Sequence, residues 1–120
     1  MAEENKNRTE YRPWGYFTVL DEGAGYKVKK IAVNPGHRLS LQLQRHRSEE
    51  WVVVEGKPTL RCGQENIEYS AGERISISKG QLHRIENKTS EVVSIIEVQI
   101  GEYLGEDDIV RFEDDYSRLE

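Results

Sequence analysis

The sequence predicts an all-β protein whose strands close into a jelly-roll barrel. Nine short candidate strands alternate with turn signals rich in glycine, proline and asparagine. Alternation of apolar and polar residues is clearest at Leu39, Leu41 and Leu43, which indicates a strand with two unlike faces. Helical periodicity is almost absent, and we expect only a short helical turn or cap in the acidic tail, residues 101–120. Short strands at regular spacing favour a jelly roll.

The candidate strands follow one another with gaps short enough for tight turns. They span residues 15–20, 26–33, 39–44, 51–54, 58–62, 65–69, 74–77, 83–86 and 92–99. Residues 1–10 are polar and lack aliphatic periodicity, so we expect a flexible N-terminal arm there. The remaining residues, 11–120, are expected to form a single domain, because a chain of 120 residues can bury one modest core.

Composition limits the classes of partner. The chain has 17 basic and 22 acidic residues, for a net charge of −5, and no clustered basic face, so nucleic acid is not an expected partner. No apolar run approaches the roughly 20 residues that span a bilayer, so a membrane is not expected either. The single cysteine, Cys62, excludes an intrachain disulfide and fits a reducing compartment, so we expect a cytoplasmic protein.

Four side chains are candidate ligands of a metal ion. Gln44 and His46 are two residues apart, so on one strand both would project to the same face. Glu49 follows the turn after His46, and His83 could join them from a later strand. Imidazole and carboxylate donors suit Zn, Mn, Fe, Ni or Co. The alternative for each histidine is a polar side chain that is merely hydrogen-bonded, and His37, in a turn, is expected to be exposed.

Two glycine-bounded segments carry these candidates, residues 36–56 and 72–87. The second resembles the second motif of the cupin superfamily, through Gly72, Gly80, His83 and Asn87. The first resembles the first cupin motif, with Gln44 in the place of one histidine. The resemblance implies the cupin double-stranded β-helix, which is a jelly-roll barrel.

A closer resemblance covers nearly everything after residue 10. The chain is similar to the C-terminal isomerase domain of type II mannose-6-phosphate isomerases, which are commonly fused to a mannose-1-phosphate guanylyltransferase domain. The matching stretches are Arg12-Pro13-Trp14-Gly15, Tyr26-Lys27-Val28-Lys29, Arg38-Leu39-Ser40-Leu41-Gln42, His46-Arg47-Ser48-Glu49, and the tail from Glu97 to Arg118. The tail is the most specific of them.

The resemblance implies interconversion of mannose 6-phosphate and fructose 6-phosphate with a bound divalent metal. Proton transfer between C1 and C2 would need a base, and a phosphate would need guanidinium or ammonium partners. The catalytic candidates are Glu97, Glu50 and Arg111. The candidates for binding the hexose phosphate are Lys29, Arg38 and Arg84.

Other functions stay open. The similar domains usually have histidine where this chain has Gln44 and Glu50. The alternative is therefore a non-catalytic cupin that binds a sugar phosphate or a nucleotide sugar and acts with a separate guanylyltransferase. Another cupin activity, such as a dioxygenase, is a third possibility. We expect a homodimer, because a jelly roll of this size leaves strand edges that a partner or the arm, residues 1–14, would cover.

Overall fold

The structure, a computed structural model, describes residues 8–116 and is built almost entirely of strands. The strands are β1 (Arg8–Arg12), β2 (Gly15–Gly23), β3 (Tyr26–Val33), β4 (Leu41–Gln44), β5 (Arg47–Glu55), β6 (Thr59–Cys62), β7 (Glu65–Glu68), β8 (Arg74–Ile77), β9 (His83–Glu86), β10 (Val93–Gly101) and β11 (Ile109–Glu113). A 3₁₀ helix, η2 (Glu106–Asp108), precedes β11. The all-β prediction is confirmed.

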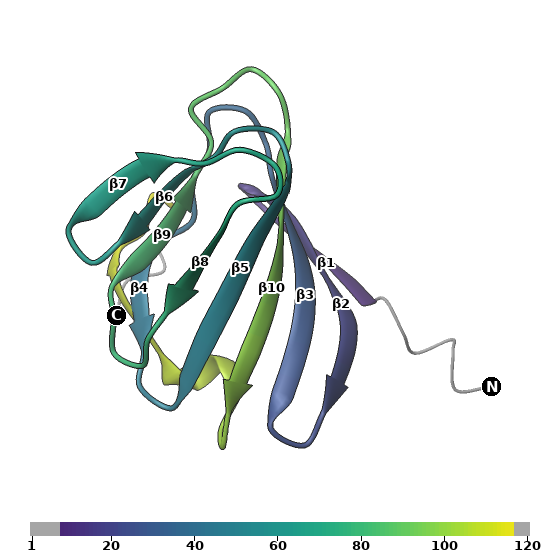
Figure 1. Cartoon of the computed structure of the whole chain (residues 1–120), viewed down its shortest axis with the longest axis vertical. Helices are drawn as coiled ribbons and strands as arrows, with labels where there is room; N and C mark the ends of the chain where they lie inside the picture. The colour runs from purple at the N-terminus through teal and green to yellow at the C-terminus, as the bar shows by residue number, and fades with distance from the viewer. Residues whose placement is uncertain (1–7, 117–120) are drawn as a thin grey trace.

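The strands form two antiparallel sheets that face each other as the walls of a barrel (Figure 1). One sheet has the order β1-β2-β3-β10-β5-β8, and the other has the order β11-β4-β9-β6-β7. Non-consecutive strands are neighbours in both sheets, as the long crossings of a jelly roll require. The tail returns to the barrel as β11, which pairs with β4.

Strand register determines which side chains face the interior. In the first sheet, Glu97 of β10 pairs with Lys29 of β3 and with Trp51 of β5, so the three share the inward face. In the second sheet, Gln42 of β4 pairs with His83 of β9 and with Arg111 of β11. These two sets project toward each other from opposite walls.

The inward faces change from apolar to charged along the barrel axis. On β5 the inward residues run from Val53 and Trp51 to Glu49, and on β10 they run from Ile95 to Glu97. The apolar part forms one core, made of Trp14, Ile31, Val33, Trp51, Val53, Leu60, Ile77, Ile85, Val93 and Ile95. The charged part lies at the end of the barrel where β5 begins and β10 ends, beside η2, the lower end in Figure 1.

The differences from the prediction that affect the site lie in the arm, at the start of β5 and in the tail. Residues 8–10, expected in the arm, belong to β1 because they pair with β2, while residues 1–7 lie outside the described part of the chain. Strand β5 begins at Arg47 rather than at residue 51, because pairing with β10 extends to Gly101. The tail contains the expected helical turn, η2, but also a strand, β11. The expected homodimer stays a prediction.

No helix among residues 8–116 combines the length and the apolar character that crossing a membrane requires.

Asn87 joins three loops at the apolar end of the barrel. Its side chain is fully buried, and its amide Nδ2 donates to the carbonyl oxygens of Val33, at 2.9 Å, and Glu91, at 2.7 Å. Its Oδ1 accepts from the backbone N–H and the hydroxyl of Thr89. Its backbone also exchanges bonds with the turn at Gly36 and His37. One side chain therefore satisfies polar groups that would otherwise be buried without partners.

We expect Asn87→Ala to lower the free energy of unfolding by about 2–3 kcal/mol, because buried carbonyl and N–H groups would lose their partners. Chemical denaturation would measure the change. Asn66→Ala, on the exposed strand β7, is the matched control and should change the free energy by less than about 0.5 kcal/mol. Equal stability of the two variants would contradict this role of Asn87.

Candidate functional site

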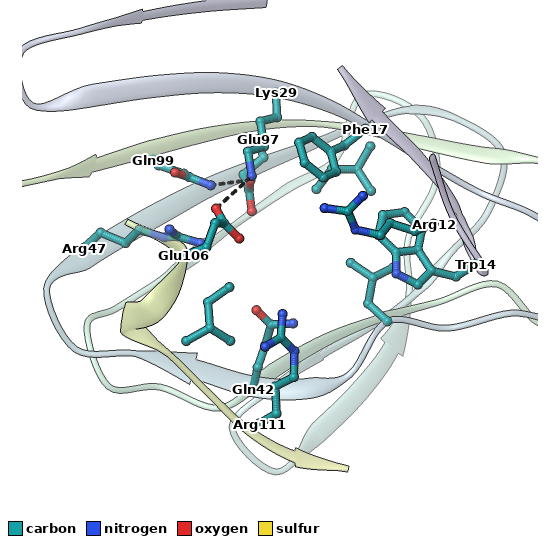
Figure 2. Close-up of a pocket in the computed structure, with 13 residues that line it drawn as sticks. Arg12, Trp14, Phe17, Lys29, Gln42, Arg47, Glu97, Gln99, Glu106 and Arg111 are labelled. Atoms are coloured by element: carbon teal, nitrogen blue, oxygen red, sulfur yellow. Dashed lines mark hydrogen bonds and ion pairs between the residues drawn. The ribbon is translucent and has the colours of Figure 1, made fainter. Parts of the chain in front are cut away.

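A cavity of about 80 Å³ opens at the charged end of the barrel, between the two sheets (Figure 2). Its apolar lining comes from Trp14, Phe17, Ile31, Leu39 and Ile109. Its polar lining comes from four cations, Arg12, Lys29, Arg47 and Arg111, two carboxylates, Glu97 and Glu106, and two amides, Gln42 and Gln99. A smaller cavity, of about 20 Å³, adjoins it and adds His83 and Trp51, with Glu97 and Gln42 lining both.

A buried ion pair stands on the β5 wall. Arg47 Nε donates to Glu49 Oε2 at 2.8 Å, and Trp51 Nε1 donates to Glu49 Oε1 at 2.9 Å. Arg47 and Glu49 are 3% and 1% exposed. His83 lies beside this group, with Nε2 3.9 Å from Glu49 Oε1 and its ring edge-on to Trp51. Both carboxylate oxygens of Glu49 therefore have N–H donors.

Glu97 is the central carboxylate of the cavity. It accepts from Gln99 Nε2 at 2.9 Å. Burial, together with the negative charge of Glu49 and a hydrogen bond with it, raises the pKa of Glu97 from its ordinary value of 4.5 to about 7, while the charges of Lys29 and Arg47 oppose the shift. A carboxyl group that titrates near neutrality can both accept and donate a proton at pH 7.

Lys29 and Glu106 meet across the cavity. Lys29 Nζ lies 3.3 Å from Glu106 Oε2 and 4.2 Å above the ring of Phe17. Figure 2 shows Arg47, Gln99 and Glu106 on one side of the cavity, with Arg12 and Trp14 on the other. The Arg12 guanidinium packs over Phe17 at 5.2 Å from the ring centroid. The cavity thus combines cations with an aromatic surface.

Three buried polar atoms in the lining have no hydrogen-bond partner among residues 8–116. They are Trp14 Nε1, Arg47 Nη1 and Gln99 Oε1. Buried polar groups in folded proteins are nearly always paired, with protein, water or ligand. Two donors and an acceptor around one cavity therefore indicate a polar occupant.

The structure does not bring His46, one of the four expected metal ligands, to this cavity. Its side chain is 54% exposed, and its Nδ1–H donates to Asp108 Oδ1 at 2.8 Å. Asp108 Oδ2 also accepts the backbone N–H groups of Arg45 and His46. Burial alone would raise the pKa of Asp108, but these bonds lower it, which keeps the carboxylate charged. The chain turns between β4 and β5, so the alternation that relates Gln44 to His46 on one strand is lost.

The other expected ligands are inside the barrel but have other partners. Gln44 is buried and donates to Gln42 Oε1 at 2.7 Å, and Glu49 is held by Arg47 and Trp51. Within residues 8–116, no group of three or more His, Cys, Asp or Glu side chains is arranged to hold a metal ion. The residues of this site therefore do not fit the divalent metal that the resemblance implies.

His83 keeps one ring nitrogen directed at the interior. Its Nδ1–H donates to the backbone oxygen of Gln81 at 2.8 Å, which leaves Nε2 on the side of Glu49. Burial lowers the pKa of His83, so the ring is neutral near pH 7. A neutral imidazole is an acceptor at Nε2.

The remaining candidates divide between the cavity and the surface. Glu97, Lys29 and Arg111 line the cavity. Glu50 alternates with the inward Glu49, so it faces outward, away from the cavity, and accepts a hydrogen bond from the Ser76 hydroxyl. Arg38 is also outside, bound through two nitrogens to Asp115 of the tail.

Arg84 borders the smaller cavity, but its guanidinium is engaged. It donates to the backbone oxygen of Leu39 and to Glu113. Through its bond to Glu113, Arg84 therefore links β9 to β11 in the tail.

Sequence reasoning missed several residues of the cavity. Arg47 and Gln99 could have been found by extending the alternation of their strands, from Trp51 and Glu97 respectively. Gln42 lies between Leu41 and Leu43 on its strand, so the same alternation places it on the opposite face from these leucines. Arg12 and Glu106 carry no local signal, since only the tertiary fold brings them to the cavity.

Comparison with solved structures supports the fold alone. The capsular polysaccharide assembling protein CapF from Staphylococcus aureus has a TM-score of 0.73 and 24% identity, over 88% of this chain and 34% of that chain. A protein with a double-stranded β-helix domain from Klebsiella pneumoniae has a TM-score of 0.68 and 21% identity, over 73% of this chain and 77% of that chain. A cupin-2 domain from Rhodospirillum rubrum has a TM-score of 0.67 and 17% identity, over 78% of this chain and 67% of that chain. The cupin barrel is thereby confirmed.

Comparison of sequences adds the family. The xanthan biosynthesis protein XanB of Xanthomonas campestris is 44% identical over 117 residues, which cover 98% of this chain and 25% of XanB. The alginate biosynthesis protein AlgA of Pseudomonas aeruginosa is 44% identical over 96% of this chain and 24% of AlgA, and the mannose-1-phosphate guanylyltransferase ManC of Salmonella typhimurium is 44% identical over 98% and 24%. The chain thus spans about a quarter of these relatives. A family model described as "Mannose-6-phosphate isomerase C-terminal" matches residues 1–114, and the chain belongs to that family.

Proposed function

We propose that this domain interconverts mannose 6-phosphate and fructose 6-phosphate. The observation that carries the proposal is Glu97, a buried carboxyl group with a pKa of about 7 that lines a cavity rich in cations. Membership of the mannose-6-phosphate isomerase C-terminal family supports the choice of substrate. The names of XanB and AlgA support a role in polysaccharide biosynthesis. The proposed reaction uses no metal ion, because the expected ligands do not converge within residues 8–116.

The chemistry requires one proton to move between neighbouring carbons. The ionised Glu97 carboxylate takes the proton from C2 of the open-chain aldose, and the electron pair of that C–H bond forms a C1–C2 double bond. The C1 carbonyl oxygen becomes an enediolate oxygen. Glu97 then returns the proton to C1, while the C2 hydroxyl loses its proton to the C1 oxygen and becomes the ketone. Atoms and charge balance, and Glu97 regains its ionised form.

The cavity also offers groups for the two ends of the substrate. Lys29, Arg12 and Arg111 are the candidates for the phosphate, since ammonium and guanidinium groups are its usual partners. Trp14 and Phe17 supply apolar surface for the face of the sugar. Removal of water from such a cavity strengthens each of these interactions.

A second candidate function is a binding domain without turnover. The exposed position of His46 and the engagement of Gln44 with Gln42 favour it, because neither side chain is then available as a metal ligand in the cavity. Such a domain would hold a sugar phosphate or a nucleotide sugar in the same cavity. Calorimetry combined with an isomerase assay separates the two, since the binding domain gives a dissociation constant but no product.

We expect Glu97→Gln to lower kcat by about 10²–10⁴-fold, because the amide cannot accept the C2 proton. Binding of mannose 6-phosphate should persist. Glu50→Gln removes the same charge from the outer face of β5 and is the matched control, with kcat unchanged. The measurement is a coupled assay of fructose 6-phosphate formation. Unimpaired turnover by the Glu97 variant would exclude it as the base.

Activity should rise with pH as Glu97 ionises. Since the base must be ionised, kcat/KM for mannose 6-phosphate should increase through pH of about 7 and level off above it. The same raised pKa predicts that folded stability contributed by the protonated group is present below pH 4.5 and is lost as pH rises through about 7. Glu97→Gln should remove both dependences, which pH-rate and pH-denaturation series would measure. A flat pair of profiles in the wild type would contradict the assignment.

Glu106→Gln should strengthen binding of mannose 6-phosphate or inorganic phosphate by about two- to five-fold, because the carboxylate competes with an anion for Lys29. Calorimetry measures the dissociation constants. Glu102→Gln is the matched control, since Glu102 pairs with Lys79 at the same 3.3 Å but outside the cavity. Equal effects of the two substitutions would mean that only the net charge matters.

A further inference from the structure

The ion pair between Arg47 and Glu49 on β5 places a positive charge beside the cavity, where the negative charge of a reacting sugar needs a cation. In a metal-dependent barrel, carboxylate and imidazole groups would hold a divalent ion against the substrate. Here both oxygens of Glu49 already accept hydrogen bonds, one from Arg47 Nε and one from Trp51 Nε1. A metal bound by Glu49 would have to displace a charge-assisted bond between groups that are 3% and 1% exposed.

Arg47 is itself a cation held at the wall of the cavity. Its guanidinium is charged at every relevant pH, and the bond from Nε to Glu49 fixes its orientation. Its Nη1 is buried and has no hydrogen-bond partner within residues 8–116. The same side chain lines the cavity together with Glu97 and Gln99 (Figure 2). A charged donor that is buried and unsatisfied at a cavity is suited to an anionic or carbonyl oxygen of a bound molecule.

We propose that Arg47 is a catalytic residue that stabilises the enediolate oxygen, and that the barrel does this without a resident divalent metal. The inference rests on the proposed function. As Glu97 takes the C2 proton, negative charge develops on the C1 oxygen, and the Arg47 Nη1–H group donates to that oxygen. A donor that is already fixed before the reaction needs no reorganisation when the charge appears. Glu49 and Trp51 are positioning residues, since they act through the Arg47 guanidinium.

The geometry of Arg47 predicts a specific kinetic change. Arg47→Lys retains a positive charge beside Glu49, so the fold has no unpaired buried carboxylate, but it removes the Nη1 donor. We expect kcat to fall by about 10²–10³-fold with a much smaller change in KM, because the lost bond forms mainly in the transition state. Arg61→Lys is the matched control, since Arg61 bonds to the backbone oxygen of Gly63 and does not line the cavity. Circular dichroism and the melting temperature check that both variants fold.

Metal analysis is the second measurement and does not depend on activity. Protein purified without an affinity tag should contain far less than one divalent ion per chain. Its melting temperature should not change when ZnCl₂ or MnCl₂ is added. Dialysis against EDTA should leave kcat unchanged.

The outcomes separate this inference from the proposed function. Turnover that EDTA abolishes and a divalent ion restores, or a metal-induced rise in melting temperature that His83→Asn removes, overturns the metal-free role of Arg47 while the isomerase proposal stands. Unchanged kcat in Arg47→Lys overturns the catalytic role alone. A wild type without turnover, with or without added metal, removes both proposals.

Discussion

The buried carboxylate of Glu49 is the constraint on which the polar end of the barrel depends. An ionised group with 1% exposure is stable only when its oxygens are satisfied, and here Arg47 and Trp51 satisfy them. The arrangement has effects beyond its own stability. The charge of Glu49 adds to the burial that raises the pKa of Glu97, and the bond to Arg47 orients a guanidinium toward the cavity. Two properties that a proton-transfer site needs thus follow from one ion pair.

The geometry of the sheets explains why these groups meet. Strand β10 lies between β3 and β5, so the inward residue Glu97 has Lys29 on one side and Trp51 on the other. The opposite wall contributes Gln42, which pairs with residues of both β9 and β11. Apolar residues fill the barrel at the other end. The core therefore supports the cavity from one side, and the charged layer leaves the other side open to a polar ligand.

Much of the fold and part of the site could be predicted from the sequence. Alternation within continuous strands correctly indicated an all-β barrel, and it brings Glu49 and His83 to the interior because each lies on a regular strand. The same rule does not hold for His46, because the turn between β4 and β5 interrupts the alternation. The His46 ring instead forms a hydrogen bond with Asp108, which lies in the distant tail. No local pattern in the sequence contains that contact.

The start of β5 at Arg47 is also not predicted by the local pattern. The predicted strand begins at residue 51, so its inward alternation does not include Arg47. Glu50 lies next to the inward Glu49 on the same strand, so it turns toward Ser76 on the outside. The start of β5 and the outward direction of Glu50 both follow from the pairing of β5 with β10. These strands are far apart in the chain, and a local pattern does not specify their pairing.

The return of the tail to the barrel also bears on the order in which the domain matures. Glu106, Ile109 and Arg111 complete the cavity, and Asp108 secures the turn before β5. These residues leave the ribosome after all the other strands that line the cavity have been synthesised. Until they are in place, the cavity lacks part of its wall. The cavity is therefore complete only when β11 has paired with β4.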